Sequence, residues 1–143
     1  MAIRTYADLD VWRRAVDLAV ALYEVTARFP KAEVFGLTAQ LRRAGVSVPS
    51  NIAEGHSRKS TAEFLRHISI ALGSLSEIET QLVIARRLGY LDEKNAKRLD
   101  SLCGEIGPLL GALYRSLSSK RQAGSATAVL SRTPSPKTPV PSP

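Results

Sequence analysis

Apolar residues recur at helical spacing along most of the chain. Between residues 35 and 55 they follow one another at steps of four, three, four and four, at Leu37, Leu41, Ala44, Val48 and Ile52. Such a period is typical of one face of an α-helix. Pro49 lies inside this stripe. Because proline has no N–H group and its ring crowds the carbonyl of residue 45, the pattern predicts a helix kinked near Val48, where Gly45 eases the crowding.

Two of the predicted helices carry more apolar surface than one partner face requires. The helix predicted from Asp8 to Phe29 has two stripes, which are Val11, Ala15, Leu18, Leu22, Val25 and Phe29, and Trp12, Val16, Ala19, Tyr23 and Thr26. The third predicted helix has a seam with coiled-coil spacing at Phe64, Ile68, Ala71, Leu75, Ile78, Leu82 and Ala85. Further apolar residues lie outside that seam, at Leu65, Ile70, Leu72, Val83 and Ile84. This surplus predicts that the chain self-associates through these two helices.

Capping and breaking residues mark the helix boundaries. Pro30 ends the first helix, and we expect the second to begin near Lys31 to Glu33 and to continue to about Gly55, a suitable residue for a helix C-terminus. Ser60 and Glu63 form a capping box before the third helix.

We expect Asp92 to cap the fourth predicted helix, which keeps its apolar stripe to Leu117. Since the three connections contain only a few residues each, consecutive helices must run antiparallel. The sequence therefore predicts an all-α fold, an antiparallel up-down-up-down four-helix bundle over residues 1–121. Residues 122–143 are rich in Pro, Ser and Thr and poor in large apolar residues, so we expect a disordered tail there.

The chain is basic overall, but much of the excess lies near its end. It holds 20 Lys and Arg against 13 Asp and Glu, and four of the basic residues (Lys120, Arg121, Arg132 and Lys137) lie at or beyond the end of the last predicted helix. The body is therefore only mildly basic. A single cysteine, Cys103, excludes an internal disulfide and suits a reducing compartment. No apolar run approaches the roughly 20 residues of a membrane span, so we expect a cytoplasmic protein without a membrane partner.

Three long motifs resemble those of a known family. They are DLDVWRRAVDLA at 8–19, FGLTAQLRRAGVSVPSNIAEGHSR at 35–58 and EFLRHISIALGSLSEIETQLVIARRLGYL at 63–91. Together they resemble the bacterial four-helix bundle proteins known as 23S rRNA intervening sequence proteins, over about residues 6 to 117. The resemblance implies a left-handed bundle that assembles into a homopentameric, barrel-like ring. Through the similar accessory subunits of diversity-generating retroelements, it also implies a ring that binds RNA or a nucleic-acid enzyme.

Basic residues are the main candidates for a binding site. They are Arg42, Arg43, Arg58, Lys59, Arg66, Arg86 and Arg87. Cations spaced along helices can follow a phosphate backbone, since each contact releases counterions. The alternative is that these residues are solvated or pair with acidic residues across subunit contacts. No aromatic platform accompanies them, so sequence-specific stacking is not predicted.

Polar residues inside apolar repeats are expected to have structural roles. They are Gln40, Asn51, Glu77, Glu79 and Gln81. We expect Glu79 to be buried, where it would accept hydrogen bonds from backbone groups near Pro49 or pair with Arg43, because buried carboxylates need partners.

Nothing in the sequence indicates catalysis, a metal or a cofactor. Glu63 and His67 lie one helical turn apart, but one such pair leaves a metal shell too empty. A nuclease would need acidic residues clustered around a metal. The sequence thus predicts a non-enzymatic, homo-oligomeric scaffold that binds RNA or DNA without sequence specificity. The alternative is a protein-interaction module that partners a nucleic-acid enzyme and makes no nucleic-acid contact itself.

Overall fold

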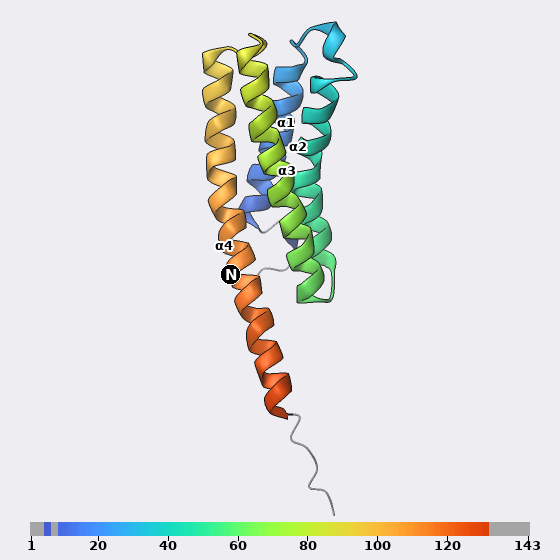
Figure 1. Ribbon diagram of the computed structural model, residues 1–143, viewed down its shortest axis with the longest axis vertical. Helices are drawn as coiled ribbons and strands as arrows, with labels where there is room; N and C mark the ends of the chain where they lie inside the picture. The colour runs from blue at the N-terminus through green and yellow to red at the C-terminus, as the bar shows by residue number, and fades with distance from the viewer. Residues whose placement is uncertain (1–4, 7–8, 132–143) are drawn as a thin grey trace, which may run out of the picture.

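The protein is an antiparallel bundle of four helices in its computed structural model, which describes residues 5–6 and 9–131 and the side chains of these residues up to 125. The helices are α1 (Asp10–Thr26), α2 (Leu37–Ser57), α3 (Thr61–Arg87) and α4 (Glu93–Ser131), and a short 3-10 helix, η2 (Lys31–Glu33), lies between α1 and α2 (Figure 1). The described ranges contain no strand. The predicted all-α, up-down-up-down architecture is confirmed.

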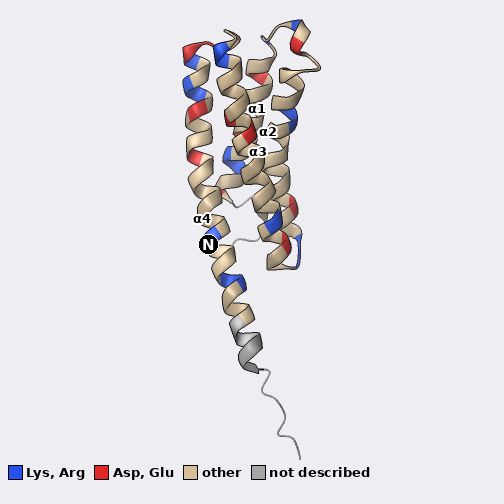
Figure 2. Ribbon diagram, in the orientation of Figure 1, with Lys and Arg blue, Asp and Glu red and all other residues tan. Residues whose placement is uncertain are grey.

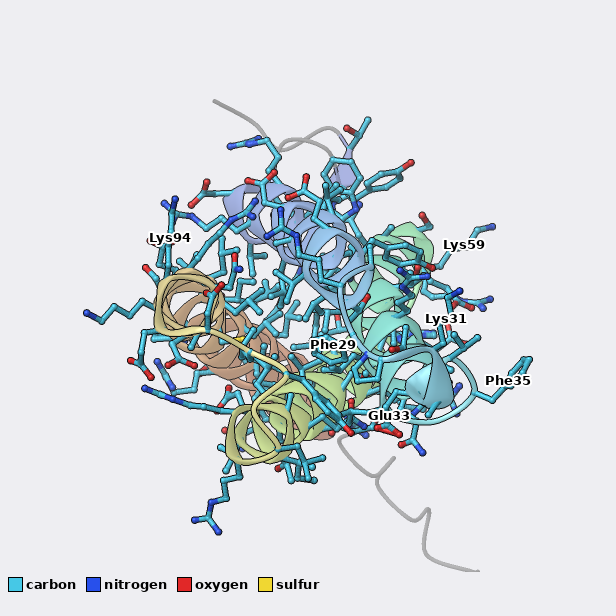
Figure 3. All side chains as sticks on the ribbon, turned by 90° about the horizontal axis from the view of Figure 1, so that it is seen from above. Phe29, Lys31, Glu33, Phe35, Lys59 and Lys94 are labelled. Carbon is cyan, nitrogen blue, oxygen red and sulfur yellow. The ribbon has the colours of Figure 1, made fainter. Side chains whose placement is uncertain are left out.

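Each helix packs against two neighbours. α2 contacts α1 and α3, and α4 contacts α3 and α1, whereas α1 and α3 make no backbone approach to each other. Seen from above, α1 and α3 accordingly lie at opposite corners of the bundle (Figure 3). Any surface on the outer side of α1 therefore faces away from any surface on the outer side of α3.

The core contains the inner stripe of every helix. The largest fully buried side chains are Leu18, Leu22, Leu41, Val48, Ile52, Ile68, Ile78, Leu99, Ile106 and Leu110. In α1 these come from the stripe that begins at Val11, and in α3 from the coiled-coil seam. The second stripe of α1 is only partly covered, and Tyr23 within it is exposed.

The second helix begins later and ends later than its sequence suggested. η2 is a separate turn, and α2 starts at Leu37 rather than near Lys31. α2 continues through Pro49 and past Gly55 to Ser57, so the prediction that Gly55 ends the helix is wrong. Gly55 is buried within the helix, and its role is in packing between helices.

Two glycines let helices approach closely. A Cβ atom on Gly45 would lie 2.8 Å from Cδ1 of Leu22 on α1, and one on Gly55 would lie 2.7 Å from Cβ of His67 on α3. Both are closer than any ordinary contact between carbon atoms. Gly45 therefore does more than ease crowding by Pro49, because its missing side chain makes room for Leu22.

Both predicted N-terminal caps are confirmed. The backbone N–H of Glu63 donates to Oγ of Ser60 at 3.2 Å, and that of Asn95 donates to Oδ1 of Asp92 at 2.7 Å. Each bond satisfies one of the donors that a helix start leaves open. The turn between α3 and α4 contains Gly89, whose φ of 77° is the left-handed conformation that favours glycine.

The last helix is longer than predicted. α4 runs to Ser131, so residues 122–131, placed in a disordered tail by composition, are helical. The segment extends beyond the rest of the bundle (Figure 1). Good helix formers such as Arg121, Gln122 and Ala123 follow Lys120 without a proline, which explains why the helix continues. The remainder of the predicted tail, 132–143, lies outside the described residues.

α3 is long and apolar enough, by length and composition, to cross a bilayer. In the most apolar stretch of α3, 44% is buried inside the bundle. The apolar composition of α3 therefore serves, in part, the core of the bundle. The outward side of α3 carries exposed Ile70, Val83 and Ile84 alongside charged residues.

Candidate nucleic-acid interface and self-association faces

The seven candidate cations divide between two ends of the bundle. Arg58, Lys59 and Arg66 lie at the α2–α3 turn, as the sequence predicts, while Arg86 and Arg87 lie at the far end of α3. α3 has 27 residues, so its ends are about 40 Å apart at 1.5 Å per residue. The seven residues therefore do not form one site.

Three of these arginines, Arg43, Arg58 and Arg86, are paired with acidic residues of the same chain. Arg43 donates to Glu77, and Arg58 donates to Oε1 of Glu54 at 2.7 Å. Acidic and basic residues are accordingly interspersed along the helices (Figure 2). Pairing lowers the charge that these residues present to a polyanion.

Arg86 is held by two acidic residues. It donates from Nε to Oε1 of Glu93 at 3.0 Å and from Nη2 to Oε2 at 2.8 Å, and Oδ2 of Asp100 lies 3.9 Å from its Nη1. The hydrogen bonds to Glu93, together with the charge of that carboxylate, raise the pKa of Arg86 above its ordinary value. Arg86 therefore fastens the end of α3 to the start of α4.

Four candidates remain without an ion pair in the part of the chain that the structure describes. One of them, Arg42, hydrogen-bonds to α1, and the other three, Lys59, Arg66 and Arg87, are exposed. Lys59 and Arg66 share the α2–α3 turn end, whereas Arg87 lies at the other end. The geometry thus reduces the candidate nucleic-acid interface to a small basic area around Lys59 and Arg66.

Arg42 differs from the other candidates. Its Nε donates to Oγ1 of Thr26 at 2.9 Å, its Nη2 donates to the carbonyl of Tyr23 at 3.3 Å, and its guanidinium lies 4.5 Å from the centre of the Tyr23 ring. No carboxylate pairs with it among the described residues. Arg42 is therefore a fixed cation whose charge is not neutralised.

The polar residues predicted to be buried occupy the seam between α2 and α3, with one exception. Gln81 is buried and its Nε2 donates to Gln40 and to Glu77, at 3.3 and 3.2 Å. The burial predicted for Glu79 is wrong, because Glu79 is exposed. Two residues along a helix rotate a side chain by about 200°, so Glu77 faces α2 and Glu79 does not. Glu77 consequently takes the role of partner to Arg43.

A hydrogen-bonded chain in the same seam was not predicted. Nδ1 of the buried His67 lies 3.0 Å from Oδ1 of Asn51, Nδ2 of Asn51 lies 3.0 Å from Oγ of Ser47, and that hydroxyl lies 2.8 Å from Oγ of Ser74. The signal available in the sequence was the spacing of polar residues along each helix, Ser47 with Asn51 and His67 with Ser74. The chain fixes the register of α2 against α3.

Large apolar residues lie exposed on the outer sides of α1 and α3. On α1, Val20 and Tyr23 are 51% and 46% exposed. On α3, Ile70, Val83 and Ile84 are 41%, 53% and 45% exposed. We call the first pair the α1 face and the second set the α3 face. Because α1 and α3 occupy opposite corners, the two faces lie on helices that do not contact each other.

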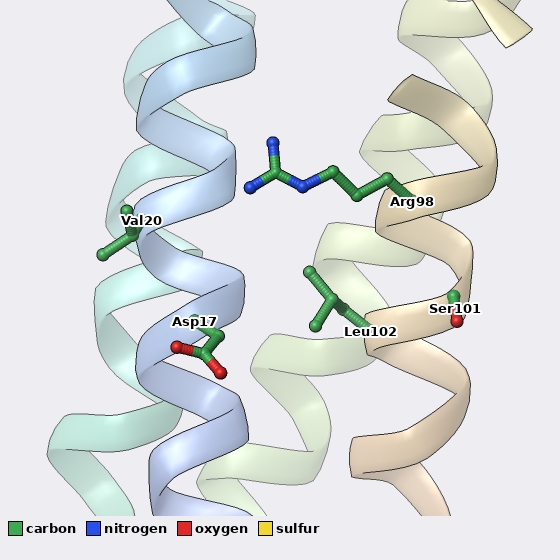
Figure 4. Close-up of a pocket in the computed structure, with 5 residues that line it drawn as sticks. All are labelled: Asp17, Val20, Arg98, Ser101 and Leu102. Carbon is green, nitrogen blue, oxygen red and sulfur yellow. The ribbon is translucent and has the colours of Figure 1, made fainter. Parts of the chain in front are cut away.

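A groove accompanies the α1 face. It has a volume of about 460 Å³ and is lined by Asp17 and Val20 of α1 and by Arg98, Ser101 and Leu102 of α4. Leu102 lies between the two helices, and Arg98 extends from α4 toward α1 (Figure 4). Nη1 of Arg98 reaches Oε2 of Glu24 at 3.0 Å. The groove gives the α1 side an apolar recess as well as an exposed ridge.

The described residues offer no ready centre for metal chemistry. Among them, no three His, Cys, Asp or Glu side chains come together closely enough to hold a metal ion. Burial is the main reason that the pKa of Cys103 is raised to about 12, and the charge of Glu79 adds to it. A thiol with so high a pKa is almost entirely protonated at neutral pH and is a poor nucleophile.

These features define a class of protein, a four-helix bundle with apolar faces at opposite corners and with acidic and basic residues interspersed along its helices. The model of the 23S rRNA-intervening sequence protein family matches residues 7–112. The chain belongs to that family, which confirms the resemblance drawn from its motifs.

A solved structure supports the same assignment. The chain is similar to a protein of unknown function from the S23 ribosomal protein family of Bacteroides thetaiotaomicron, with 25% sequence identity and a TM-score of 0.66. The match covers 73% of this chain and 97% of that one. A comparison with curated proteins gave no match.

Proposed function

We propose that the protein is a non-enzymatic scaffold that assembles from copies of itself. The observation that carries this proposal is the exposure of Val20, Tyr23, Val83 and Ile84 on two outward faces. Large apolar residues exposed on a charged bundle are candidates for an interaction site. Covering such residues contributes about 25 cal/mol for each Å² of apolar area removed from water.

The placement of the two faces favours a head-to-tail contact, in which the α3 face of one copy packs against the α1 face and its groove on the next. A contact between two different patches repeats from copy to copy, and it closes into a ring when the rotation permits. The family resemblance implies a ring of five. If each patch instead packed against the same patch on another copy, each contact would join only two chains.

Complementation between two variants tests this arrangement. Val20→Glu places a charge on the α1 face and Val83→Glu places one on the α3 face, and both positions are exposed, so each variant should fold as judged by circular dichroism. Each variant alone should remain at the 15.5 kDa of one chain. Mixed in equal amounts they should form a dimer, because one intact α3 face meets one intact α1 face.

A matched control is Ala112→Glu, which adds the same charge at an exposed position of α4 away from both faces and should assemble like the wild-type chain. Assembly of either single variant to the wild-type mass would overturn the head-to-tail contact. So would a mixture of two folded variants that stays monomeric.

The second part of the proposal is that the ring binds RNA or DNA through phosphate contacts. It is supported by the unpaired Lys59 and Arg66 at the α2–α3 turn, which a symmetric ring would present once in every copy. Repetition raises the overall affinity without new contacts. Since few cations contribute from each copy, binding by one copy alone should be weak.

Salt titration of RNA binding tests this second part. Binding of a fluorescent single-stranded RNA should weaken with salt, and losing one phosphate contact lowers the slope of log K against log salt by about 0.7 per contact. Lys59→Gln and Arg66→Gln should each lower the slope in this way. Lys97→Gln, which removes an exposed cation of α4, should leave it unchanged. Equal slopes for all variants, or no binding at low salt, would leave protein interaction as the function of the assembled scaffold.

A further inference from the structure

The corner of the bundle between η2 and α2 contains a second groove, which adjoins the α1 face through the contact of Arg42 with Tyr23. Its volume is about 460 Å³, within the range of ligand sites. The residues that line it come from the end of α1, from η2 and from the start of α2, and they are Thr26, Ala27, Phe29, Lys31, Val34, Phe35, Thr38, Ala39 and Arg42. Most of them are apolar or small.

Phe35 is the most exposed large apolar residue of this corner. It is 96% exposed, and its neighbour Val34 is 49% exposed. Seen from above, Phe35 points outward from the bundle, away from Phe29, which points inward (Figure 3). Exposed aromatic side chains are common anchors of protein interfaces.

The charged residues that line the groove are both cations, Lys31 and Arg42. Arg42 is held in place by Thr26 and Tyr23, and its remaining N–H groups have no carboxylate partner in the described part of the chain. An arginine whose orientation is already fixed loses little conformational entropy when it binds a carboxylate. Glu33 lies close by, with its Oε1 against Gly36, but it does not line the groove.

Two further features favour an anion at this position. α2 begins here without a side-chain cap, so the first backbone N–H groups of the helix are open and its dipole favours negative charge. Thr38, which lines the groove, is only 6% exposed, and its Oγ1 has no hydrogen-bond partner. A buried hydroxyl without a partner is uncommon in native proteins.

We propose that this corner docks an acidic peptide segment of a partner protein. A large apolar side chain of the segment packs against Phe35 and Val34, and a neighbouring carboxylate pairs with Arg42. The apolar walls favour a peptide over a nucleic acid, because a phosphate backbone would leave them uncovered and Phe35 offers only one stacking surface. The two cations favour an acidic sequence. This proposal is independent of the ring, since each copy has a complete groove.

Selection from a random peptide library tests the proposal. A phage-displayed library of peptides of about twelve residues is selected on the full chain and depleted on the Phe35→Ser variant. An extended peptide spans roughly 3.3 Å per residue, so peptides of this length can reach across the groove. The selected peptides should share an aromatic or large aliphatic residue next to Asp or Glu. Selected peptides without acidic residues, or no enrichment over the depleted pool, would overturn the proposal.

The affinity of a selected peptide, measured by fluorescence anisotropy, locates the contact. Arg42→Gln and Lys31→Gln should each weaken binding, the former by about tenfold or more, as expected for loss of a charge-assisted pair. Arg98→Gln, which removes a cation from the other groove, should bind like the wild-type chain. If Arg42→Gln disturbs the packing of Tyr23, the Lys31→Gln variant still tests whether a cation of the groove contributes to peptide binding.

Competition and mass measurements separate this proposal from its rivals. Single-stranded RNA should not displace the peptide, whereas displacement would assign the groove to nucleic acid. The Phe35→Ser variant should keep the wild-type mass in light scattering. A loss of assembly in Phe35→Ser would instead show that a second copy of the chain occupies the groove, and this would overturn the proposal without bearing on the α1 and α3 faces.

Discussion

Gly55 of α2 packs directly against His67 of α3. The space that a Cβ atom would need at residue 55 is already occupied, since that atom would lie 2.7 Å from Cβ of His67 and 3.0 Å from Cδ1 of Phe64. The close approach lets the imidazole of His67 reach Asn51. The patterned stretch between residues 35 and 55 therefore ends in a residue that serves the contact between α2 and α3.

Replacing Gly55 with alanine should destabilise the fold. The added methyl group forces α2 and α3 apart, and overpacking of this kind costs about 1–3 kcal/mol. Denaturation in urea measures the change. The matched control is Gly104→Ala in α4, where nothing lies within 4 Å of the new Cβ. It should be neutral or stabilising by up to about 1 kcal/mol, through helix propensity alone. Equal effects at the two positions would contradict the packing role of Gly55.

Replacing Asn51 with alanine should cost about 1–3 kcal/mol of unfolding free energy, because the buried His67 and the hydroxyl of Ser47 each lose a hydrogen-bond partner. Ser50→Ala, at the exposed neighbouring position, should change stability by less than about 0.5 kcal/mol. A neutral Asn51→Ala would show that water or a rearranged side chain satisfies the imidazole.

Cys103 should react slowly with iodoacetamide in the folded protein. Burial raises the pKa of its thiol from 9.0 to about 12, so the thiolate fraction near pH 8 falls by roughly a thousandfold relative to an unperturbed cysteine. Mass spectrometry of the alkylated chain, with and without urea, measures the difference. Rapid labelling without urea would show that the core around Cys103 opens readily.

The same thiol makes stability depend on alkaline pH. The unfolded chain loses the thiol proton near pH 9, while the folded chain keeps it up to about pH 12. The unfolded state therefore binds fewer protons in this window, and stability falls as pH rises, by up to about 1.4 kcal/mol per pH unit. Below pH 9 the thiol contributes no pH dependence. Cys103→Ala should show a shallower decline, and identical profiles would contradict the raised pKa.

The helices and their core were predictable from the sequence because one physical effect determines both. Apolar residues such as Leu18, Ile68 and Ile78 repeat at the helical period, and burying them requires the faces that carry them to meet. The capping residues Ser60 and Asp92 were equally predictable, because a cap forms hydrogen bonds with residues nearby in the chain.

The site was less predictable because its contacts join residues distant in sequence. Whether Glu77 or Glu79 meets Arg43 depends on the rotation of α3 about its axis, which the polar pattern alone did not determine. The role of Gly55 likewise depends on its neighbour on α3. Composition also misled at the C-terminal side, where residues 122–131 continue α4 although they lack a strong apolar stripe.

The mass of the full-length chain in solution tests the central claim most directly. Light scattering during size exclusion, over protein concentrations from about 1 to 100 μM, covers the range in which specific assemblies with micromolar affinity form. Because apolar residues of the α1 and α3 faces are left exposed on a single copy, the account predicts a discrete multiple of 15.5 kDa, with five copies for the ring that the family resemblance implies. A folded chain that stays at 15.5 kDa across this range would contradict it.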